Sequence, residues 1–501
     1  MLTRNSAAGG AREKIGRLRS RLSGGSPKSS WSMKTHWTFL LALAAPWVPP
    51  VAAEDAQPAA PPPRIVFIAL DAVPYEVVAE LTDEERGEAA IFRRFKPPVP
   101  LISTFPSTSN LAFGGILERL GVEHSPGYES RFFDRRANRR RGGGPRSYFR
   151  IRFPWRDFFD WRTTSLFRKT MRGFHPVRSN LRAIDRSLEA FLASEQRVYF
   201  IYYGGTDLLG HMHGPRALEA VLRGLDRDLE ELRRRTPNQP FYAVLFSDHG
   251  QAGGTPLKNV RRDLKQALAA AGYRVAGRLR GPRDVVFMPY GLVSSLVLFT
   301  REGEERPVAE IAASTAGVEF CVAASAGGWQ VESRRGSAEI RRRDGDGIPR
   351  WSYRRLSGDP LQLGPLLAAA GDGEVWRSDR WWLRATRDRA FPDPLYRISR
   401  AFDLVDNPAS VICSLAPGHM YGAIKTELLA RISIGRLRWT HGALERQASL
   451  GFVLSDLPGW QPDGAVRFSD ALAPFARPAG LEVIRAQAEA ARAADRSRSG
   501  H

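Results

Sequence analysis

Three aspartates stand just after short apolar runs of the kind that form buried strands. Asp71 and Asp248 directly follow such runs, and Asp207 comes shortly after a third. In open α/β sheets, ligands bind outside the carboxyl ends of the strands, so we expect these three side chains to meet at one edge. A buried charge without a partner is costly, and three neighbouring carboxylates also repel each other. The pattern therefore predicts cations bound between them.

Three histidines occupy positions suited to the same cations. His211 follows Asp207 by one helical turn, which places both side chains on one side of a helix. His249 is adjacent to Asp248, and His441 lies in a turn before a glycine. Carboxylate oxygen and imidazole nitrogen are zinc ligands. Each of these residues alone could be a helix cap, a turn residue or a satisfied core histidine, but together they predict two metal sites.

A run of hydroxyl side chains precedes a helical pattern. Residues 101–110 carry several serines and threonines, and apolar residues recur at helical spacing over residues 111–120. A helix N-terminus binds anions through its free N–H groups and its dipole. A threonine hydroxyl placed there becomes a useful nucleophile when a bound metal lowers its pKa. The alternative interpretation is an ordinary Ser/Thr-rich loop that caps a helix.

The order of these features resembles the alkaline phosphatase superfamily, and within it the type I phosphodiesterase/nucleotide pyrophosphatase-like branch. The resemblance covers residues 64–255 and 405–460, and the whole set is far more specific than any single motif. It is carried by Asp71, Thr104-Phe105-Pro106, Asp207-x-x-x-His211 followed by Gly214-Pro215, Ser247-Asp248-His249-Gly250 and Thr440-His441-Gly442.

The resemblance implies a hydrolase of phosphate esters with two divalent metal ions, zinc being the expected metal. It implies that Thr104 is the nucleophile and forms a covalent phospho-threonine. Two metals about 4 Å apart would clamp both oxygens of an in-line displacement. One implied metal site consists of Asp71, Asp248, His249 and the oxygen of Thr104, and the other of Asp207, His211 and His441.

One position departs from the nucleotide branch. That branch has an asparagine directly after Thr-x-Pro, where it helps to hold a phosphoryl oxygen, and this chain has Ser107. Ser107 can still donate a hydrogen bond to substrate, and Asn110 is a second candidate for that contact. A nucleotide substrate is therefore not implied. Ser107 and Thr108 are also lesser candidates for the nucleophile.

Among whole-protein interpretations, a phosphodiesterase is favoured and a phosphomonoesterase of the same superfamily is the first alternative. The second alternative is a basic protein that binds nucleic acid or the cell envelope through a non-catalytic site, although the complete ligand set argues against it. A sulfatase is disfavoured because no cysteine lies near Thr104. The only cysteines are Cys321 and Cys413, and two small core residues are favoured over a disulfide.

The formal net charge of +21 attracts anions. The expected partner is a phosphorylated small molecule or a lipid-like anionic substrate, and nucleic acid is not favoured. Peripheral contact with a membrane surface is compatible with this charge, but no pattern of several membrane spans is found.

The N-terminal region predicts export to the periplasm or the cell exterior. A basic start at Met33, an apolar run and small residues before Glu54 form a signal peptide pattern over residues 33–53. Residues 1–32 are predicted to be a disordered basic leader upstream of the true start. Residues 54–63 form a Pro-rich linker, and residues 476–501 form an Ala/Arg-rich tail.

The apolar runs at residues 64–70, 198–203 and 241–246 predict strands that are buried on both faces. Helical patterns lie at residues 181–192 and 218–232. This alternation predicts an α/β fold with a mostly parallel central sheet flanked by helices, and the resemblance implies that it is alkaline-phosphatase-like.

Residues 64–274 and 405–475 are the predicted catalytic core, in which strand patterns return at residues 410–415 and 451–454. Residues 275–404 are predicted to be an inserted cap. This cap is expected to contain a small antiparallel part, with a hairpin at residues 327–343.

Overall fold

A computed structural model describes residues 63–119, 125–129, 131–142, 176–288, 290–291, 293–345, 347–368, 374–422, 427–428, 437–460, 462 and 464–473. The predicted leader, signal peptide and tail lie outside these residues, as does the predicted linker apart from Pro63. Within the described part of the chain, no helix has both the length and the apolar character needed to cross a membrane.

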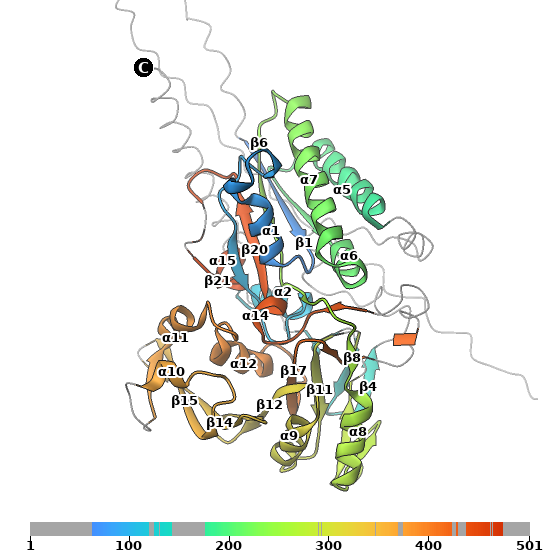
Figure 1. Cartoon of the computed structure of the whole chain (residues 1–501), viewed down its shortest axis with the longest axis vertical. Coiled ribbons are helices and arrows are strands. Elements are labelled where there is room, and N and C mark those ends of the chain that lie inside the picture. The colour runs from blue at the N-terminus through green and yellow to red at the C-terminus, as the bar shows by residue number, and fades with distance from the viewer. Residues whose placement is uncertain are drawn as a thin grey trace, which may run out of the picture. The chain divides into compact units, whose positions relative to one another are not determined.

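A first sheet of six strands has the order β21-β2-β20-β6-β1-β5 (Figure 1). β1 pairs in parallel with β5 and with β6, whereas β20 runs antiparallel to both of its neighbours. The mostly parallel central sheet is therefore confirmed. The strand bounds are Arg64–Leu70 (β1), Val99–Ile102 (β2), Val198–Tyr203 (β5), Phe241–Phe246 (β6), Leu450–Ser455 (β20) and Val466–Arg467 (β21).

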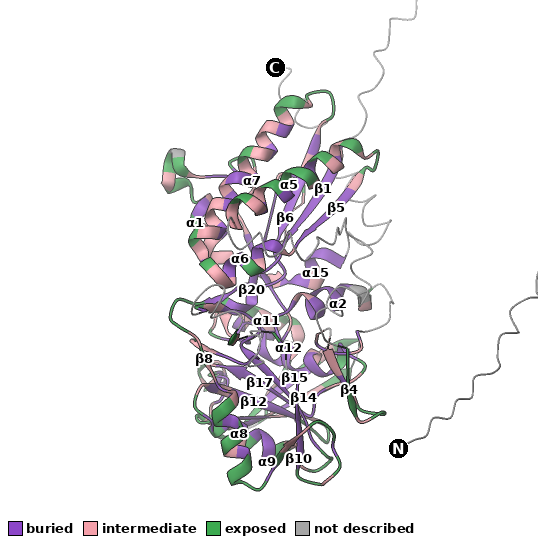
Figure 2. Ribbon diagram, turned by 90° about the vertical axis from the view of Figure 1, so that its right-hand side faces the viewer, coloured by how far each residue is buried: buried purple, intermediate pink, exposed green. Residues whose placement is uncertain are grey.

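Helices cover both faces of this sheet. Val66 and Ile68 of β1 pack with α1, α5 and α7, and the alternate residues Ile65 and Phe67 pack with α2 and α15. Because both faces are buried, β1 carries a continuous apolar run instead of an alternating one. Figure 2 shows these strands buried and the helices exposing their outer sides. The helix bounds are Tyr75–Thr82 (α1), Ser109–Arg119 (α2), Pro176–Ala193 (α5), Gly205–His213 (α6), Pro215–Arg235 (α7) and Phe468–Leu472 (α15).

A second sheet of nine strands has the order β16-β15-β14-β13-β12-β17-β11-β10-β9. All of its neighbours pair antiparallel except β9 and β10. Its strands are Arg274–Ala276 (β9), Asp284–Phe287 (β10), Ser295–Phe299 (β11), Val318–Ser325 (β12), Gly328–Ser333 (β13), Gly336–Gly345 (β14), Ile348–Gly358 (β15), Trp376–Ser378 (β16) and Val411–Leu415 (β17).

The second sheet also has a helical layer on each face. Cys321 of β12 packs in one cluster with α8 and α9, and the adjacent Phe320 and Val322 pack in another with α10, α11 and α12. These helices span Arg261–Ala270 (α8), Glu305–Ser314 (α9), Gly364–Leu367 (α10), Asp379–Thr386 (α11) and Pro394–Asp403 (α12).

Short elements complete the described chain. They are Glu84–Ala89 (η1), Arg131–Asp134 (β3), Arg139–Gly142 (β4), Ala252–Gly253 (β7), Lys258–Asn259 (β8), His419–Met420 (β18), Trp439–Thr440 (β19) and Arg446–Ser449 (α14).

The second sheet differs from the sequence-based expectation in two respects. The hairpin at residues 327–343 is confirmed as β13 and β14, but the antiparallel part is a large sheet and not a small one. β17, expected in the catalytic core, pairs instead with β11 and β12. An isolated apolar run does not reveal which distant strand it will pair with, because long-range pairing depends on the rest of the fold.

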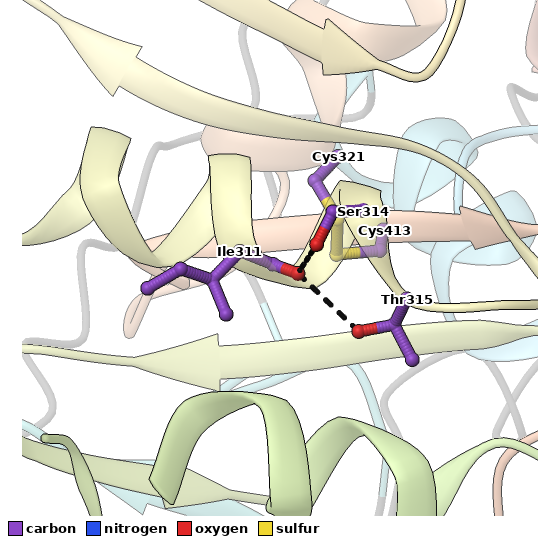
Figure 3. Close-up of a disulfide and its surroundings, with 5 residues drawn as sticks. All are labelled: Ile311, Ser314, Thr315, Cys321 and Cys413. Atoms are coloured by element: carbon purple, nitrogen blue, oxygen red, sulfur yellow. Dashed lines mark hydrogen bonds between the residues drawn. A yellow bond between two sulfur atoms is a disulfide. The ribbon is translucent and has the colours of Figure 1, made fainter. Parts of the chain in front are cut away.

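The two cysteines pair, which corrects the expectation of two separate core residues. Cys321 of β12 and Cys413 of β17 lie opposite each other in register and form a disulfide (Figure 3). The bond lies beside the end of α9, where the hydroxyls of Ser314 and Thr315 donate to the Ile311 carbonyl.

Candidate metal centre

The first ligand group combines two residues of α6 with one from a distant loop. Asp207 and His211 lie one turn apart on α6, which begins directly after β5. His441 follows β19. Oδ1 of Asp207 lies 3.2 Å from Nε2 of His211 and 3.4 Å from Nε2 of His441. One ligand atom from each residue lies within 4.8 Å of the others, a spacing that one cation can bridge.

The second ligand group lies at the carboxyl ends of two adjacent parallel strands. Asp71 follows β1, and Asp248 and His249 follow β6. Nε2 of His249 lies 3.5 Å from Oδ1 of Asp71 and 3.7 Å from Oδ2 of Asp248. These three residues also offer ligand atoms within 4.8 Å of one another.

The two groups are neighbours. The imidazole rings of His249 and His441, one from each group, stack with their centroids 4.2 Å apart. The rings of His211 and His441 lie 5.1 Å apart. The structure thus brings together all six protein ligands predicted from the sequence, in the two sets that were predicted.

Backbone carbonyls orient the three imidazoles. Nδ1 of His211 lies 2.8 Å from the Trp439 carbonyl oxygen, and Nδ1 of His249 lies 3.0 Å from that of Gly250. Nδ1 of His441 lies 2.8 Å from the Ser107 carbonyl oxygen. A carbonyl can only accept, so Nδ1 carries a proton in each ring and Nε2 is the nitrogen that faces the carboxylates. This is the usual outer support of a metal-binding histidine.

Burial and like charge act strongly on Asp71. Burial raises the pKa of Asp71 well above its usual range, and the charges of Asp248 and Asp207 raise it further. Hydrogen bonds from Tyr202 and Ser109 oppose this rise. A nearby divalent cation would favour the ionised form and offset the repulsion between these carboxylates.

In the first ligand group, burial and neighbouring charges shift the pKa values of Asp207 and His441 in a different way. Burial favours the neutral form of Asp207, but the charges of His211 and His441 outweigh it and hold the pKa of Asp207 below its usual value. Burial and the charge of His249 lower the pKa of His441 to about 3. His441 is therefore neutral near neutral pH, which is the form that binds metals.

The three carboxylates of the centre are not neutralised by basic side chains of the described residues. No described Lys or Arg forms an ion pair with Asp71, Asp207 or Asp248. Oδ2 of Asp248 is buried and has no hydrogen-bond partner among the described residues. Buried charges are normally paired or bound to metals, so the donor set fits two divalent cations.

Three supporting residues were not predicted from the sequence. Nε2 of Gln251 lies 3.1 Å from both the carbonyl oxygen and Oδ1 of Asp207. The Tyr202 hydroxyl donates to Oδ2 of Asp71 at 2.5 Å, and the Ser109 hydroxyl donates to Oδ1 of Asp71 at 3.0 Å. The position of Ser109 at the start of a helical pattern was the only sequence signal for any of them.

Residues 104–109, here called the hydroxyl loop, connect β2 to α2. Oγ1 of Thr104 donates to the Pro106 carbonyl at 3.1 Å. The Ser107 hydroxyl lies 2.9 Å from the Ala443 carbonyl oxygen, and the Asn110 amide donates to the Gly127 carbonyl at 2.9 Å. The structure therefore gives the predicted Thr104, Ser107 and Asn110 side chains partners outside the six ligands, and their proposed roles stay predictions.

Comparison with known protein families finds one match to part of the chain. The family described as type I phosphodiesterase/nucleotide pyrophosphatase matches residues 123–320. Over this segment the chain is similar to hydrolases of the phosphodiesterase/nucleotide pyrophosphatase type. The matched segment of the type I phosphodiesterase family includes Asp207, His211, Asp248 and His249 but neither Asp71 nor His441.

Two solved structures illustrate what the chain is similar to. Murine ectonucleotide pyrophosphatase/phosphodiesterase 5 is 10% identical, with 82% of this chain and 94% of that chain covered and a TM-score of 0.39. Phosphonoacetate hydrolase from Sinorhizobium meliloti is 12% identical, with 85% and 95% covered and a TM-score of 0.42. No curated protein sequence matches the chain.

Proposed function

We propose that the chain is a phosphodiesterase that holds two zinc ions and acts through a covalent phospho-threonine. The observation that carries this proposal is the adjacency of the two ligand groups, each with carboxylate and imidazole donors. When bound, two such ions supply Lewis-acid stabilisation of the phosphoryl oxygens and of the attacking and leaving oxygens.

The roles proposed for the chain's own residues follow from their surroundings. Asp71, Asp248 and His249 would hold one ion, and Asp207, His211 and His441 the other. A threonine in the hydroxyl loop would attack phosphorus, and Thr104 is the candidate that the family resemblance indicates. α2 begins at Ser109, whose hydroxyl donates to Asp71, so the N-terminus of this helix lies beside the second ligand group and would help to bind an anionic substrate.

The proposed substrate class is a phosphorylated small molecule or a lipid-like phosphate diester. The net charge of +21 supports an anionic substrate, and the matched family supports a phosphodiester. Ser107 replaces the asparagine of the nucleotide branch, so we do not propose a nucleotide in particular. A phosphomonoesterase with the same centre is the alternative that the assay below separates.

The test compares chromogenic phosphate diester, phosphate monoester, phosphonate and sulfate substrates, with and without chelator. We expect the diester to be the best substrate, close to two zinc ions per chain, and loss of turnover on chelation that zinc restores. His441→Ala should lower turnover by at least about a hundredfold. His213→Ala is the matched control, because His213 is exposed on the same helix as His211. Turnover that is indifferent to chelation would contradict the proposal.

We also propose that the protein works in the periplasm or outside the cell. The signal pattern at residues 33–53 supports export, and the Cys321–Cys413 disulfide is of the kind that persists in oxidising compartments. Sequencing the N-terminus of the protein from fractionated cells tests this proposal. A chain that begins near Met1 and stays in the cytoplasmic fraction would contradict it.

A further inference from the structure

We propose that the open face of β14, β15 and β16 binds the anionic headgroups of a lipid membrane. This surface, here called the arginine face, consists of Arg341, Arg343, Ile348, Arg350, Arg354 and Trp376. It contains none of the six ligand residues, and the inference does not depend on the proposed function.

Helices cover only one end of this face of the second sheet. α8 and α9 pack against it in a cluster that includes Cys321 and Ala323 of β12 but no residue of β14, β15 or β16. Figure 1 shows β14 and β15 at the opposite end of the sheet from α8. Ile340 and Tyr353 point to the other face, where they pack in one cluster with α10, α11 and α12. The described helices therefore leave the arginine face uncovered.

Strand register places the arginine side chains on one side of the sheet. Arg343 of β14 lies opposite Arg350 of β15, and Ser352 of β15 lies opposite both Arg341 of β14 and Trp376 of β16. Side chains alternate along a strand, so residues in matching register share a face. The arginines and Trp376 therefore form one continuous surface across three strands.

Two of these arginines face each other without a counter-charge. Arg343 and Arg350 are both exposed, and neither forms an ion pair with an acidic side chain of the described residues. Like charges directly opposite each other on a sheet are destabilising. An anionic surface that binds both guanidinium groups would offset this repulsion.

The rest of the arginine face is also basic on balance. Arg341 and Arg354 share a single acidic partner, Glu339. A second glutamate, Glu374, accepts a hydrogen bond from the Ser352 hydroxyl at 2.6 Å. The face thus carries four arginines against two glutamates, which gives it the charge that attracts anionic lipids.

Apolar side chains accompany this charge. Ile348 is 55% exposed and directly follows the turn of the β14–β15 hairpin, where polar residues are usual. Trp376 is half-buried, and the Arg343 guanidinium lies 4.4 Å from the centroid of its ring. Tryptophan and arginine suit the boundary between headgroups and acyl chains, because each combines an apolar body with a polar end.

A nucleic acid is the other polyanion that could meet such a surface, and the structure favours it less. Unpaired bases stack on open aromatic rings, but Arg343 already covers a face of the Trp376 ring. The exposed side chain of Ile348 would stay in water beside a phosphate backbone, whereas a membrane would bury it.

The test measures binding of the purified chain to vesicles by co-sedimentation. The vesicles consist of phosphatidylcholine alone or of phosphatidylcholine mixed with phosphatidylglycerol. We expect binding to the mixed vesicles only, and weaker binding when salt is added. Joint replacement Arg343→Ala and Arg350→Ala should weaken binding by at least about tenfold, since each arginine near an anionic surface contributes. Arg343→Lys with Arg350→Lys should retain most of the binding.

A label at the hairpin reports on insertion. The described chain has no free cysteine, so Ile348→Cys can carry an environment-sensitive fluorophore. Its emission should shift to the blue with mixed vesicles and stay unchanged with neutral ones.

The matched control removes the same charge at the other end of the sheet. Arg278→Ala with Arg280→Ala changes two exposed arginines between β9 and β10 and should leave vesicle binding unaltered. Zinc content and unfolding temperature should keep their wild-type values in all variants. Equal weakening by both alanine pairs, or equal binding to neutral vesicles, would overturn the inference. So would binding of a labelled DNA strand that the Arg343/Arg350 alanine pair abolishes while vesicle binding persists. None of these outcomes bears on the chelator-sensitive turnover that tests the proposed function.

Discussion

The Nδ1 atom of His441 lies 2.8 Å from the carbonyl oxygen of Ser107, which joins a metal-ligand candidate directly to the hydroxyl loop. The next residue strengthens this junction, because the Gly442 carbonyl accepts from the Ser107 N–H at 3.3 Å. The His441 imidazole and the hydroxyl loop are therefore coupled. A substitution that shifts the backbone near His441 should also change the position of the hydroxyl loop.

Gly442→Ala tests this coupling. Gly442 has a φ of +111°, and an added Cβ would come within 2.9 Å of the Ser295 Oγ. We expect a lower free energy of unfolding, by about 1–3 kcal/mol, and weaker zinc binding, because His441 must shift. Gly303→Ala is the control, since Gly303 has a φ of +86° but open space around it. Equal zinc affinity in both variants would contradict the prediction.

Gln251→Leu should weaken the first ligand group. Gln251 donates to Asp207 at 3.1 Å and fits against Gly210, so leucine would leave the Asp207 carboxylate without its support. Outer contacts of this kind are worth about 10–100-fold in metal affinity. Competition with a zinc indicator measures the change, and Gln266→Leu on the exposed side of α8 should leave it unaltered.

Asp248→Asn should stabilise the metal-free protein while abolishing turnover. Without metal, the buried Asp248 carboxylate faces that of Asp71 and leaves Oδ2 unpartnered. Removing one charge relieves repulsion, so we expect the chelator-treated variant to unfold at a higher temperature than chelator-treated wild type. Asp263→Asn, on exposed α8, should not show this gain. A lower unfolding temperature for the metal-free variant would count against the repulsion described here.

Arg397→Gln should harm both stability and turnover. The Arg397 guanidinium is buried and bonds to the carbonyls of Thr104 and Leu444 and to Oγ of Ser449. Glutamine cannot reach all of these acceptors, and each buried acceptor left unsatisfied costs about 1–3 kcal/mol. Because the hydroxyl loop would loosen, kcat should fall more than KM rises. Arg384→Gln, exposed on α11, is the matched control.

Replacing both Cys321 and Cys413 with alanine should lower stability without changing the metal centre. The disulfide closes a long stretch of chain, with a sequence separation of 92. Such a link is worth about 2–5 kcal/mol in typical domains. Denaturant unfolding measures the loss, and zinc content should stay at the wild-type value. A matching loss of zinc would show that the second sheet supports the centre.

The sequence pattern alone was sufficient to predict the strands of the first sheet that are buried on both faces. The strands at Arg64–Leu70, Val198–Tyr203 and Phe241–Phe246 were predicted to the residue, because continuous apolar runs of that length suit a sheet buried on both faces. Once these ends were known, Asp71 and Asp248 had to lie at the same edge.

Other features of the site could not be predicted, because they depend on contacts between residues that are distant in the sequence. Threonine, serine and asparagine crowd residues 103–110, and nothing in their order shows which hydroxyl turns toward the ligands. Tyr202 reaches Asp71 only because β5 pairs with β1 in one register. Likewise, Cys321 and Cys413 become neighbours only through the pairing of β12 with β17.

The order in which the ligands occur along the chain has a consequence for assembly. By residue 249 the chain contains all three members of the second group, but His441 follows the whole second sheet. His441 must then return across a separation of 334 residues to bond with Ser107. Contacts across such a distance are slow to form. Occupancy of the first group would therefore require the chain as far as His441, whereas the ligands of the second group are all present by His249.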